Sequence, residues 1–238
     1  MNVLARELGI GSHCYDAALS AMLGNARQEI DIFTVNGMPF LQLAGFGPDA
    51  DIIRRITPKL KRRLGPASHM VTAFQVLNTS LPRITMTTDG GEILCGEQII
   101  LGNGGCYGGD ARLFRQALYD DGKVDAAIIQ HKHIGILLEV LFSMLQQGAC
   151  ADMTPSGMEI RRLRRCVITA ENTISYQLDG DYIGNLQRGE ELIVEKAKSK
   201  LTICVPPSPE PNTPFMKLLT APIVHSLLHK IAEIRATD

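Results

Sequence analysis

Two acidic turns hold the side chains best suited to chemistry. Asp179-Gly180-Asp181 places two carboxylates on one tight turn, and Asp120-Asp121-Gly122 places two more near the middle of the chain. Paired carboxylates can hold magnesium or accept the proton of a hydroxyl group. Asp-Gly is also an ordinary hairpin turn, so each segment taken alone is compatible with a structural role. Each turn is expected at the end of a strand, where a rigid scaffold can present it.

Two glycine-rich segments are the next candidates. Residues 45–50, Gly-Phe-Gly-Pro-Asp-Ala, have the spacing of a dinucleotide fingerprint, and Gly102-Asn103-Gly104 opens the most glycine-dense segment of the chain. The first lacks the required βαβ unit and the second lacks the lysine of a P-loop, so neither predicts a nucleotide site by itself. The first fits a glycine turn that starts a helix at Asp49. Dense glycines in the second let the backbone pass close to a ligand or to another strand, and both alternatives stay open.

Two basic runs allow two interpretations. Residues 59–63 and 161–165 are either solvated faces or surfaces attracted to anionic lipid headgroups, at about 1 kcal/mol per charge. If the second run is one strand, alternation places Arg162 and Arg164 on the same face.

Composition indicates an ordinary folded protein. The chain has 238 residues, 45% of them hydrophobic, and a net charge of −1, which leaves no basic excess for a nucleic-acid partner. Its six cysteines lack zinc-ribbon or thioredoxin spacing, which favours reduced thiols in the cytoplasm. The histidines at 131 and 133 and at 225 and 229 lack a third metal ligand. The longest apolar stretch, 134–145, is too short to span a bilayer, although contact with a membrane surface stays open.

Hydrophobic alternation and closely spaced turns predict a mainly β fold. Asn36-Gly37 between two alternating runs is a strong hairpin signal, and Asp89-Gly90-Gly91 is a second pivot. Further strands are expected at 84–88, 93–101, 124–130, 158–169, 173–178 and 191–204, and helices at 13–24, 49–57, 66–79 and 134–147. This pattern is typical of an antiparallel β-sandwich with inserted short helices.

The chain divides into four expected parts. Residues 1–25 hold a short helix, 26–205 form the sandwich, 206–214 are a proline-rich linker, and 215–238 repeat apolar residues at helical spacing. The last part predicts an amphipathic tail helix, bent at Pro222. Its apolar stripe must be buried on its own domain, on a second copy in a homo-oligomer or on a membrane, and we expect it to pack on protein.

Five segments in register resemble a known family. Residues 40–50 resemble the N-x-A-G-x-G-x-D-A segment of the diacylglycerol kinase family, which includes bacterial lipid kinases and sphingosine kinases. Residues 61–66, 102–109, 120–122 and 177–181 are similar to the family's next landmarks, in the same order and spacing. The resemblance implies the β-rich C-terminal domain of these kinases, and residues 1–25 would then be a remnant of the domain or linker before it.

The same resemblance implies phosphoryl transfer from ATP to a lipid hydroxyl, such as that of diacylglycerol. By position, Asp179 would be the carboxylate that accepts the hydroxyl proton, with Asp181 beside it. Asp120 and Asp121 would match the family's structural magnesium site. The implied cofactor-binding residues are Gly45, Gly47, Gly102, Asn103 and Gly104.

The first residues carry a further implication. Residues 2–9 resemble the stretch that follows the family's nucleotide-binding motifs, G-G-D-G-T and G-T-x-N. We therefore expect the nucleotide-binding half to be missing and ATP not to bind this chain alone. Asp181 replaces a glutamate of the family, Gln42 an asparagine and Arg115 a proline, which is compatible with drift after a loss of activity. The basic runs and the tail helix favour the alternative, a non-catalytic lipid- or protein-binding module.

Overall fold

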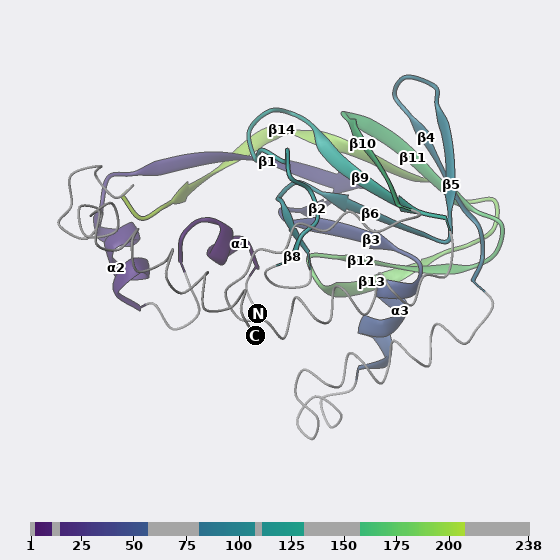
Figure 1. Ribbon diagram of the computed structural model, residues 1–238, viewed down its shortest axis with the longest axis horizontal. Coiled ribbons are helices and arrows are strands. Elements are labelled where there is room, and N and C mark those ends of the chain that lie inside the picture. Colours follow the sequence, from purple (N-terminus) through teal and green to yellow (C-terminus); the bar gives the residue numbers. More distant parts are fainter. Residues whose placement is uncertain (1–2, 11–14, 57–80, 108–110, 131–157, 208–238) are drawn as a thin grey trace, which may run out of the picture.

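The alternating segments of the sequence form antiparallel sheets in the computed structural model, which describes residues 3–10, 15–56, 81–107, 111–130 and 158–207 (Figure 1). In spatial order the first sheet contains β2 (Met38–Phe40), β1 (Arg27–Val35), β14 (Leu192–Cys204), β11 (Arg165–Ala170), β4 (Ile84–Thr88) and β5 (Ile93–Gly96). The second contains β10 (Met158–Leu163), β9 (Val124–Ile129), β6 (Gln98–Gly102), β3 (Leu43–Phe46), β12 (Ile174–Leu178) and β13 (Asp181–Leu186). A short pair, β7 (Cys106–Tyr107) and β8 (Ala111–Arg112), and the helices α1 (Val3–Glu7), α2 (Tyr15–Leu23) and α3 (Pro48–Arg55) complete the described residues.

This architecture confirms the mainly β antiparallel fold and the helix expected at 13–24. The helix expected to start at Asp49 begins one residue earlier, at Pro48. The expected hairpin at Asn36-Gly37 is present, and both residues have the positive φ of a type I′ turn, 47° and 84°. The helices expected at 66–79, 134–147 and 215–238 lie outside the described residues, as does most of the proline-rich linker.

The main core lies between the two sheets. Side chains of the first sheet, such as Phe33 and Ile168, meet side chains of the second, such as Phe46 and Leu101, and all four are fully buried. Strands of the first sheet alternate between buried and more exposed positions, as in β11, because one face of that sheet is covered. Burial of this apolar area supplies most of the stabilisation.

The second sheet is covered on both faces. Its strands β9 and β12 are buried at every position. Over its outer face, α3 packs on β3, β12 and β13, and Leu113 and Phe114 cover Ile100 and Ala127. The candidate site residues lie along this outer face and along the loops that border it.

Two strands predicted as continuous are each divided between the sheets. The segment 93–101 breaks at Glu97, so β5 belongs to the first sheet and β6 to the second. The segment 158–169 breaks at Arg164, between β10 and β11. The prediction of single strands was wrong because apolar alternation continues while the chain crosses from one sheet to the other. Arg164 therefore lies at a sheet crossing and does not share a strand face with Arg162.

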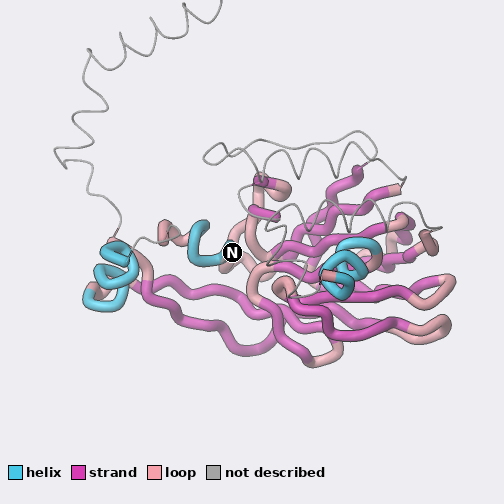
Figure 2. The backbone as a smooth tube through the Cα atoms, turned by 90° about the horizontal axis from the view of Figure 1, so that it is seen from below, coloured by secondary structure: helices cyan, strands magenta, loops and turns pink. Residues whose placement is uncertain are grey.

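A long two-stranded ribbon extends from the sandwich. β1 and β14 pair from Val35 and Val194 outward to Arg27 and Cys204, and α2 lies at the far end of this ribbon, away from α3 (Figure 2). The α2 side chains Tyr15, Leu19, Met22 and Leu23 are exposed. No helix within the described part of the chain is both long enough and apolar enough to cross a bilayer.

We predict that Leu101→Ala lowers the free energy of unfolding by about 2–5 kcal/mol, because the fully buried leucine leaves a cavity between the sheets. The matched control is Leu201→Ala on β14, where the leucine is exposed and the expected change is within about 0.5 kcal/mol. Urea denaturation measures both values. Equal losses in the two variants would contradict the assignment of the core.

Candidate functional site

The turn at 179–181 joins β12 to β13 and is anchored by its own aspartate. Asp179 and Gly180 have positive φ, 51° and 91°, the pair of values expected of a type I′ hairpin. Asp179 Oδ1 accepts the backbone N–H groups of Gln42 and Leu43 at 2.8 and 2.9 Å, and Oδ2 accepts that of Leu41 at 2.8 Å. Three backbone N–H groups thus point at this carboxylate and fix its position. Asp181 begins β13 and is exposed.

A buried carboxyl group lies behind this turn. Asp49, in the first turn of α3, is 5% exposed, and Gln177 Nε2 donates to its Oδ2 at 3.2 Å. Gln177 Oε1 in turn accepts the N–H of Gly180 at 2.8 Å, so one glutamine joins Asp49 to the acidic turn. Burial raises the pKa of Asp49 to about 7, and the hydrogen bond from Gln177 offsets part of that effect.

The position of the Asp49 side chain explains why residue 45 is a glycine. A Cβ atom on Gly45 would lie 1.9 Å from Asp49 Oδ2 and 2.7 Å from Gln177 Nε2, so only glycine fits at this position of β3. Gly47 precedes α3 with a φ of 107°, which also favours glycine. The role of both glycines in binding a nucleotide remains a prediction.

The glycine loop after β6 is also held by side chains. Asn103 is 1% exposed, and its Nδ2 donates to the carbonyl groups of Asp31 at 2.8 Å and Leu41 at 2.9 Å. Gly102 lies against the Phe114 ring, 2.3 Å from where its Cβ would be. A Cβ on Gly104 would come within 2.2 Å of the Tyr119 hydroxyl oxygen. The glycines here allow close packing against the chain's own side chains.

Glu7 on α1 fixes the end of this loop. Its Oε1 accepts the N–H groups of Gly105 at 2.9 Å and Cys106 at 3.1 Å, and its Oε2 accepts Gln42 Nε2 and the Tyr119 hydroxyl, both at 2.5 Å. Burial of Tyr119, together with the adjacent Glu7 carboxylate, raises the pKa of its hydroxyl. The N-terminal helix is thereby tied to the loop 102–106.

The acidic turn at 120–122 carries its own counter-ions. Asp121 Oδ1 accepts the N–H of Lys123 at 2.9 Å, and Oδ2 forms an ion pair with Arg162. Beside it lies Asp31 of β1, whose Oδ2 accepts the N–H of Gly122 at 2.6 Å and whose Oδ1 pairs with Lys196 at 2.9 Å. Every carboxylate oxygen of Asp31 and Asp121 therefore has a donor from the chain.

These contacts do not fit a magnesium ion at the turn as it stands. The Asp120 side chain is exposed, and its carbonyl oxygen accepts Lys200 Nζ at 3.4 Å. Among the residues that the structure describes, no three His, Cys, Asp or Glu side chains form a group suited to a metal ion. Cationic side chains already lie beside Asp31 and Asp121.

The predicted elements meet along one hydrogen-bonded network. Asp179 binds the loop 41–43, Asn103 binds Leu41 and Asp31, and Asp31 binds the turn at Gly122. Segments that lie far apart in the sequence are thus side by side at one border of the second sheet.

The sequence predicted no role for four residues of this network: Glu7, Asp31, Gln42 and Gln177. Gln42 was noted only as a departure from the family's asparagine, and Gln177 only as part of the segment 177–181. Asp31 left a signal, because it alternates with Phe33 and Val35 and so falls on the core-facing side of its strand.

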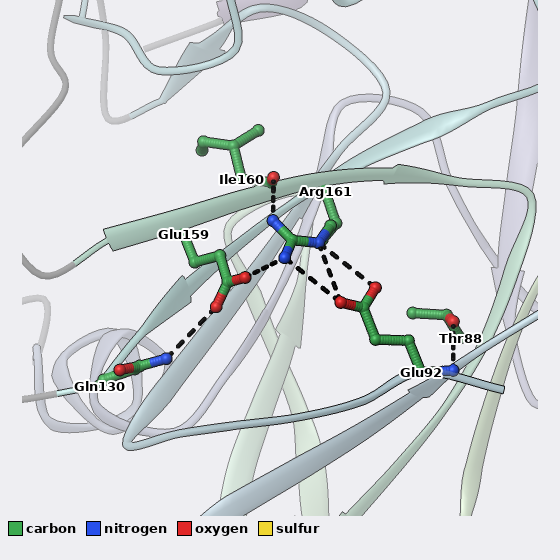
Figure 3. Close-up of polar contacts among 6 residues, drawn as sticks. All are labelled: Thr88, Glu92, Gln130, Glu159, Ile160 and Arg161. Atoms are coloured by element: carbon green, nitrogen blue, oxygen red, sulfur yellow. Dashed lines mark hydrogen bonds and ion pairs between the residues drawn. The ribbon is translucent and has the colours of Figure 1, made fainter. Parts of the chain in front are cut away.

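The basic run 161–165 is largely neutralised. The Arg161 guanidinium contacts the carboxylates of Glu92, at 3.2 Å, and Glu159, whose other oxygen accepts Gln130 Nε2 (Figure 3). Arg162 pairs with Asp121, and Arg165 with Glu195 at 3.5 Å. We therefore expect this run to be attracted to an anionic surface less than its sequence suggested, because paired charges leave little net field.

Proteins similar in sequence to this chain are named as diacylglycerol kinase or probable lipid kinase. The family model of the YegS C-terminal NAD kinase beta sandwich-like domain matches residues 43–195. A protein named diacylglycerol kinase from Bacillus subtilis (strain 168) is 24% identical over 210 residues, which cover 84% of this chain and 68% of that protein. A probable lipid kinase YegS-like protein of Alcanivorax borkumensis is 27% identical over 172 residues, which cover 69% of this chain and 55% of the relative.

Solved structures share the fold. A putative diacylglycerol kinase from Bacillus anthracis str. Sterne superposes with a TM-score of 0.65 at 19% identity, over 87% of this chain and 67% of that one. This chain therefore spans between about half and about two thirds of the length of these three relatives.

We predict that Asp49 makes stability depend on pH. The folded carboxyl keeps its proton up to about pH 7, whereas the unfolded group loses it near 3.8, so its contribution is fully present below pH 3.8 and is lost as pH rises to 7. Asp49→Asn should remove this fall, which is at most about 4 kcal/mol. Urea denaturation at pH 4.5 to 8 measures it.

The matched control is Asp16→Asn on α2, where the side chain is exposed. Its stability should follow the same pH profile as the wild-type chain. A profile for Asp49→Asn that is parallel to wild type would contradict the burial of an ionisable carboxyl at this position.

Proposed function

Because the chain belongs to the family of the YegS C-terminal NAD kinase beta sandwich-like domain, we propose that it takes part in ATP-dependent phosphorylation of a lipid hydroxyl such as that of diacylglycerol. The names of its relatives, diacylglycerol kinase and probable lipid kinase, support this reaction class. In such a reaction the lipid hydroxyl oxygen bonds to the γ-phosphorus, the bond to the ADP oxygen breaks, and the hydroxyl proton passes to a base.

The observation that carries the proposal is the anchored carboxylate of Asp179. Three backbone N–H groups from the loop 41–43 fix its position, and Gln177 supports the turn from behind. Phosphoryl transfer depends mainly on positioning and charge stabilisation, which such a rigid turn provides. Oδ2 accepts one of the three N–H groups, and a carboxylate oxygen has room for a second hydrogen bond, from a lipid hydroxyl.

Asp181 is the second carboxylate of this turn. It lies two residues away on the same turn, and its side chain is exposed. We assign the proton-accepting role to Asp179 and a supporting charge to Asp181. Magnesium, carried with ATP, would neutralise charge on the transferred phosphoryl group.

The phosphate-binding part of the site is proposed to come from outside the described loops. A phosphate cradle needs backbone N–H groups that point at the ligand. Here the N–H groups of Gly105 and Cys106 donate to Glu7. That of Ala50 donates to Asp49, and that of Gly122 to Asp31. The chain's own carboxylates occupy the donors that phosphate oxygens would use.

We therefore predict no shift in the thermal unfolding midpoint of this chain when millimolar Mg-ATP is added. The comparison is a thermal melt with Mg-ATP and with magnesium alone. A saturable rise with Mg-ATP would mean that the chain holds a nucleotide site of its own, and the assignment of the glycine loops to internal packing would fail.

The catalytic proposal is tested by transfer of labelled phosphate from ATP to diacylglycerol in mixed micelles. The chain is assayed alone and joined to the part of the Bacillus subtilis relative that lies outside the match. We expect activity in the joined protein and a loss of at least about 100-fold in Asp179→Asn, the typical contribution of a positioned base. Asp181→Asn, the matched control on the same turn, should retain more activity.

Asp179 also supports the loop 41–43, so folding must be measured beside activity. Asp179→Asn keeps an acceptor oxygen for part of that loop, and its melt should still be cooperative. Full activity in a folded Asp179→Asn variant would exclude the proposed role of this carboxylate.

The second candidate is a non-catalytic binding module, which the exposed apolar side chains of α2 favour. Sedimentation with vesicles of phosphatidylcholine and diacylglycerol, with and without anionic lipid, tests it. Binding without any phosphoryl transfer in the joined protein would support this alternative. Since most of the run 161–165 is ion-paired, such binding should depend on apolar contact more than on salt concentration.

A further inference from the structure

One corner of the sandwich joins the two sheets through charged groups. The turn at 120–122 leads into β9 of the second sheet, while Asp31 belongs to β1 of the first. The backbone N–H of Asp31 also donates to the carbonyl of Tyr119 at 2.5 Å, next to this turn. The contacts of the Asp31 side chain therefore decide how the sheets are held at this corner.

Asp31 is a buried charge. It is 1% exposed, its Oδ2 accepts the N–H of Gly122, and its Oδ1 faces Lys196 Nζ at 2.9 Å and Lys200 Nζ at 3.7 Å. Burial of a carboxylate away from water costs free energy unless positive charge lies close to it. Two ammonium groups supply that charge from a single strand, β14.

An irregularity in the sheet brings both lysines to one carboxylate. Asp31 pairs with Lys200 in the β1–β14 register, but Phe33, only two residues later, pairs with Lys196. The extra residues of β14 form a bulge that shifts the register. The Lys196 stem then lies over Gly122, with Cε 3.7 Å from where a Cβ would stand.

A guanidinium group completes the arrangement. Arg162, on β10 of the second sheet, pairs with Asp121 Oδ2. The turn thus has one cationic partner from each sheet, Lys196 through Asp31 and Arg162 through Asp121. This differs from the exposed pair Arg165–Glu195, whose side chains are 48% and 55% exposed and which contributes little.

We propose that Lys196, with Lys200 and Arg162, takes the place of a divalent cation at this turn, so that internal counter-ions neutralise Asp31 and Asp121 and the fold needs no magnesium there. A divalent ion at such a turn would neutralise two carboxylates and link their strands. The ammonium and guanidinium groups neutralise the oxygens of Asp31 and Asp121, and the hydrogen bond from Gly122 N–H to Asp31 Oδ2 supplies the link between the sheets. The proposal concerns the fold and does not depend on any catalytic role.

The experiment is thermal unfolding of the full chain with EDTA, with MgCl2, and with KCl at matched ionic strength. The wild-type midpoint should be the same in all three. Lys196→Met should lower the midpoint in EDTA by about 5 °C or more, because it leaves Asp31 buried with less compensation. Lys198→Met, an exposed lysine on the same strand, is the matched control and should not change it.

The response of the unfolding midpoint to magnesium distinguishes a substitute for a divalent cation from an ordinary ion pair. In Lys196→Met the midpoint should rise saturably with MgCl2 and not with KCl. If Lys196→Met does not fold, the double variant Asp31→Asn/Lys196→Met, which removes both charges, should fold and be indifferent to magnesium. A wild-type midpoint that rises saturably with MgCl2, a Lys196→Met variant as stable as Lys198→Met, or no response of Lys196→Met to magnesium would each overturn the proposal.

Discussion

This site depends on hydrogen bonds from backbone N–H groups of turns and loops to side-chain carboxylates. Loops at the border of a sheet carry amide groups without strand partners, and these amides need acceptors when water is excluded. Asp179 accepts hydrogen bonds from the loop 41–43, Glu7 from residues 105 and 106, and Asp31 from Gly122. Each of these side chains comes from an element distant in sequence from the amides it holds, so the loops become rigid only when the whole sandwich has formed.

This constraint connects the fold to the proposed chemistry. A catalytic base must be held to within a fraction of an ångström, and hydrogen bonds that satisfy a loop also fix the side chain that accepts them. The same bonds have an opposite consequence for phosphate binding, since an amide donated to Glu7 or Asp31 is no longer available to a ligand. Positioning of a carboxylate and exclusion of a phosphate from these loops thus follow from one set of contacts. The division of labour proposed for this chain, in which it presents the base and another segment holds the nucleotide, has its physical origin here.

Sequence reasoning reached the fold class because turns and alternation are local properties. Asn36-Gly37 and Asp179-Gly180 require positive φ, and both form the hairpins expected of them. The breaks at Glu97 and Arg164 could not be predicted, because crossing from one sheet to the other leaves the pattern of apolar residues unchanged. Asp49 and Gln177 stood within the recognised motifs, but their burial depends on how α3 lies on β3 and β12. Glu7 offered no signal at all, since its four partners are assembled only by tertiary structure.

The acidic turn at 120–122 shows why a motif does not determine its chemistry. Two aspartates followed by glycine are compatible with a metal site, a base or a hairpin. Residues elsewhere in the chain determine which of these roles the turn has. Lys196 and Lys200 reach Asp31 because a bulge in β14 brings both to one carboxylate, and Arg162 reaches Asp121 because β10 lies beside β9. A buried carboxylate without these cations would strongly favour a bound metal ion, whereas with them it is already neutralised. The electrostatic balance of the whole corner, set by three strands and a turn, therefore determines what this motif can bind.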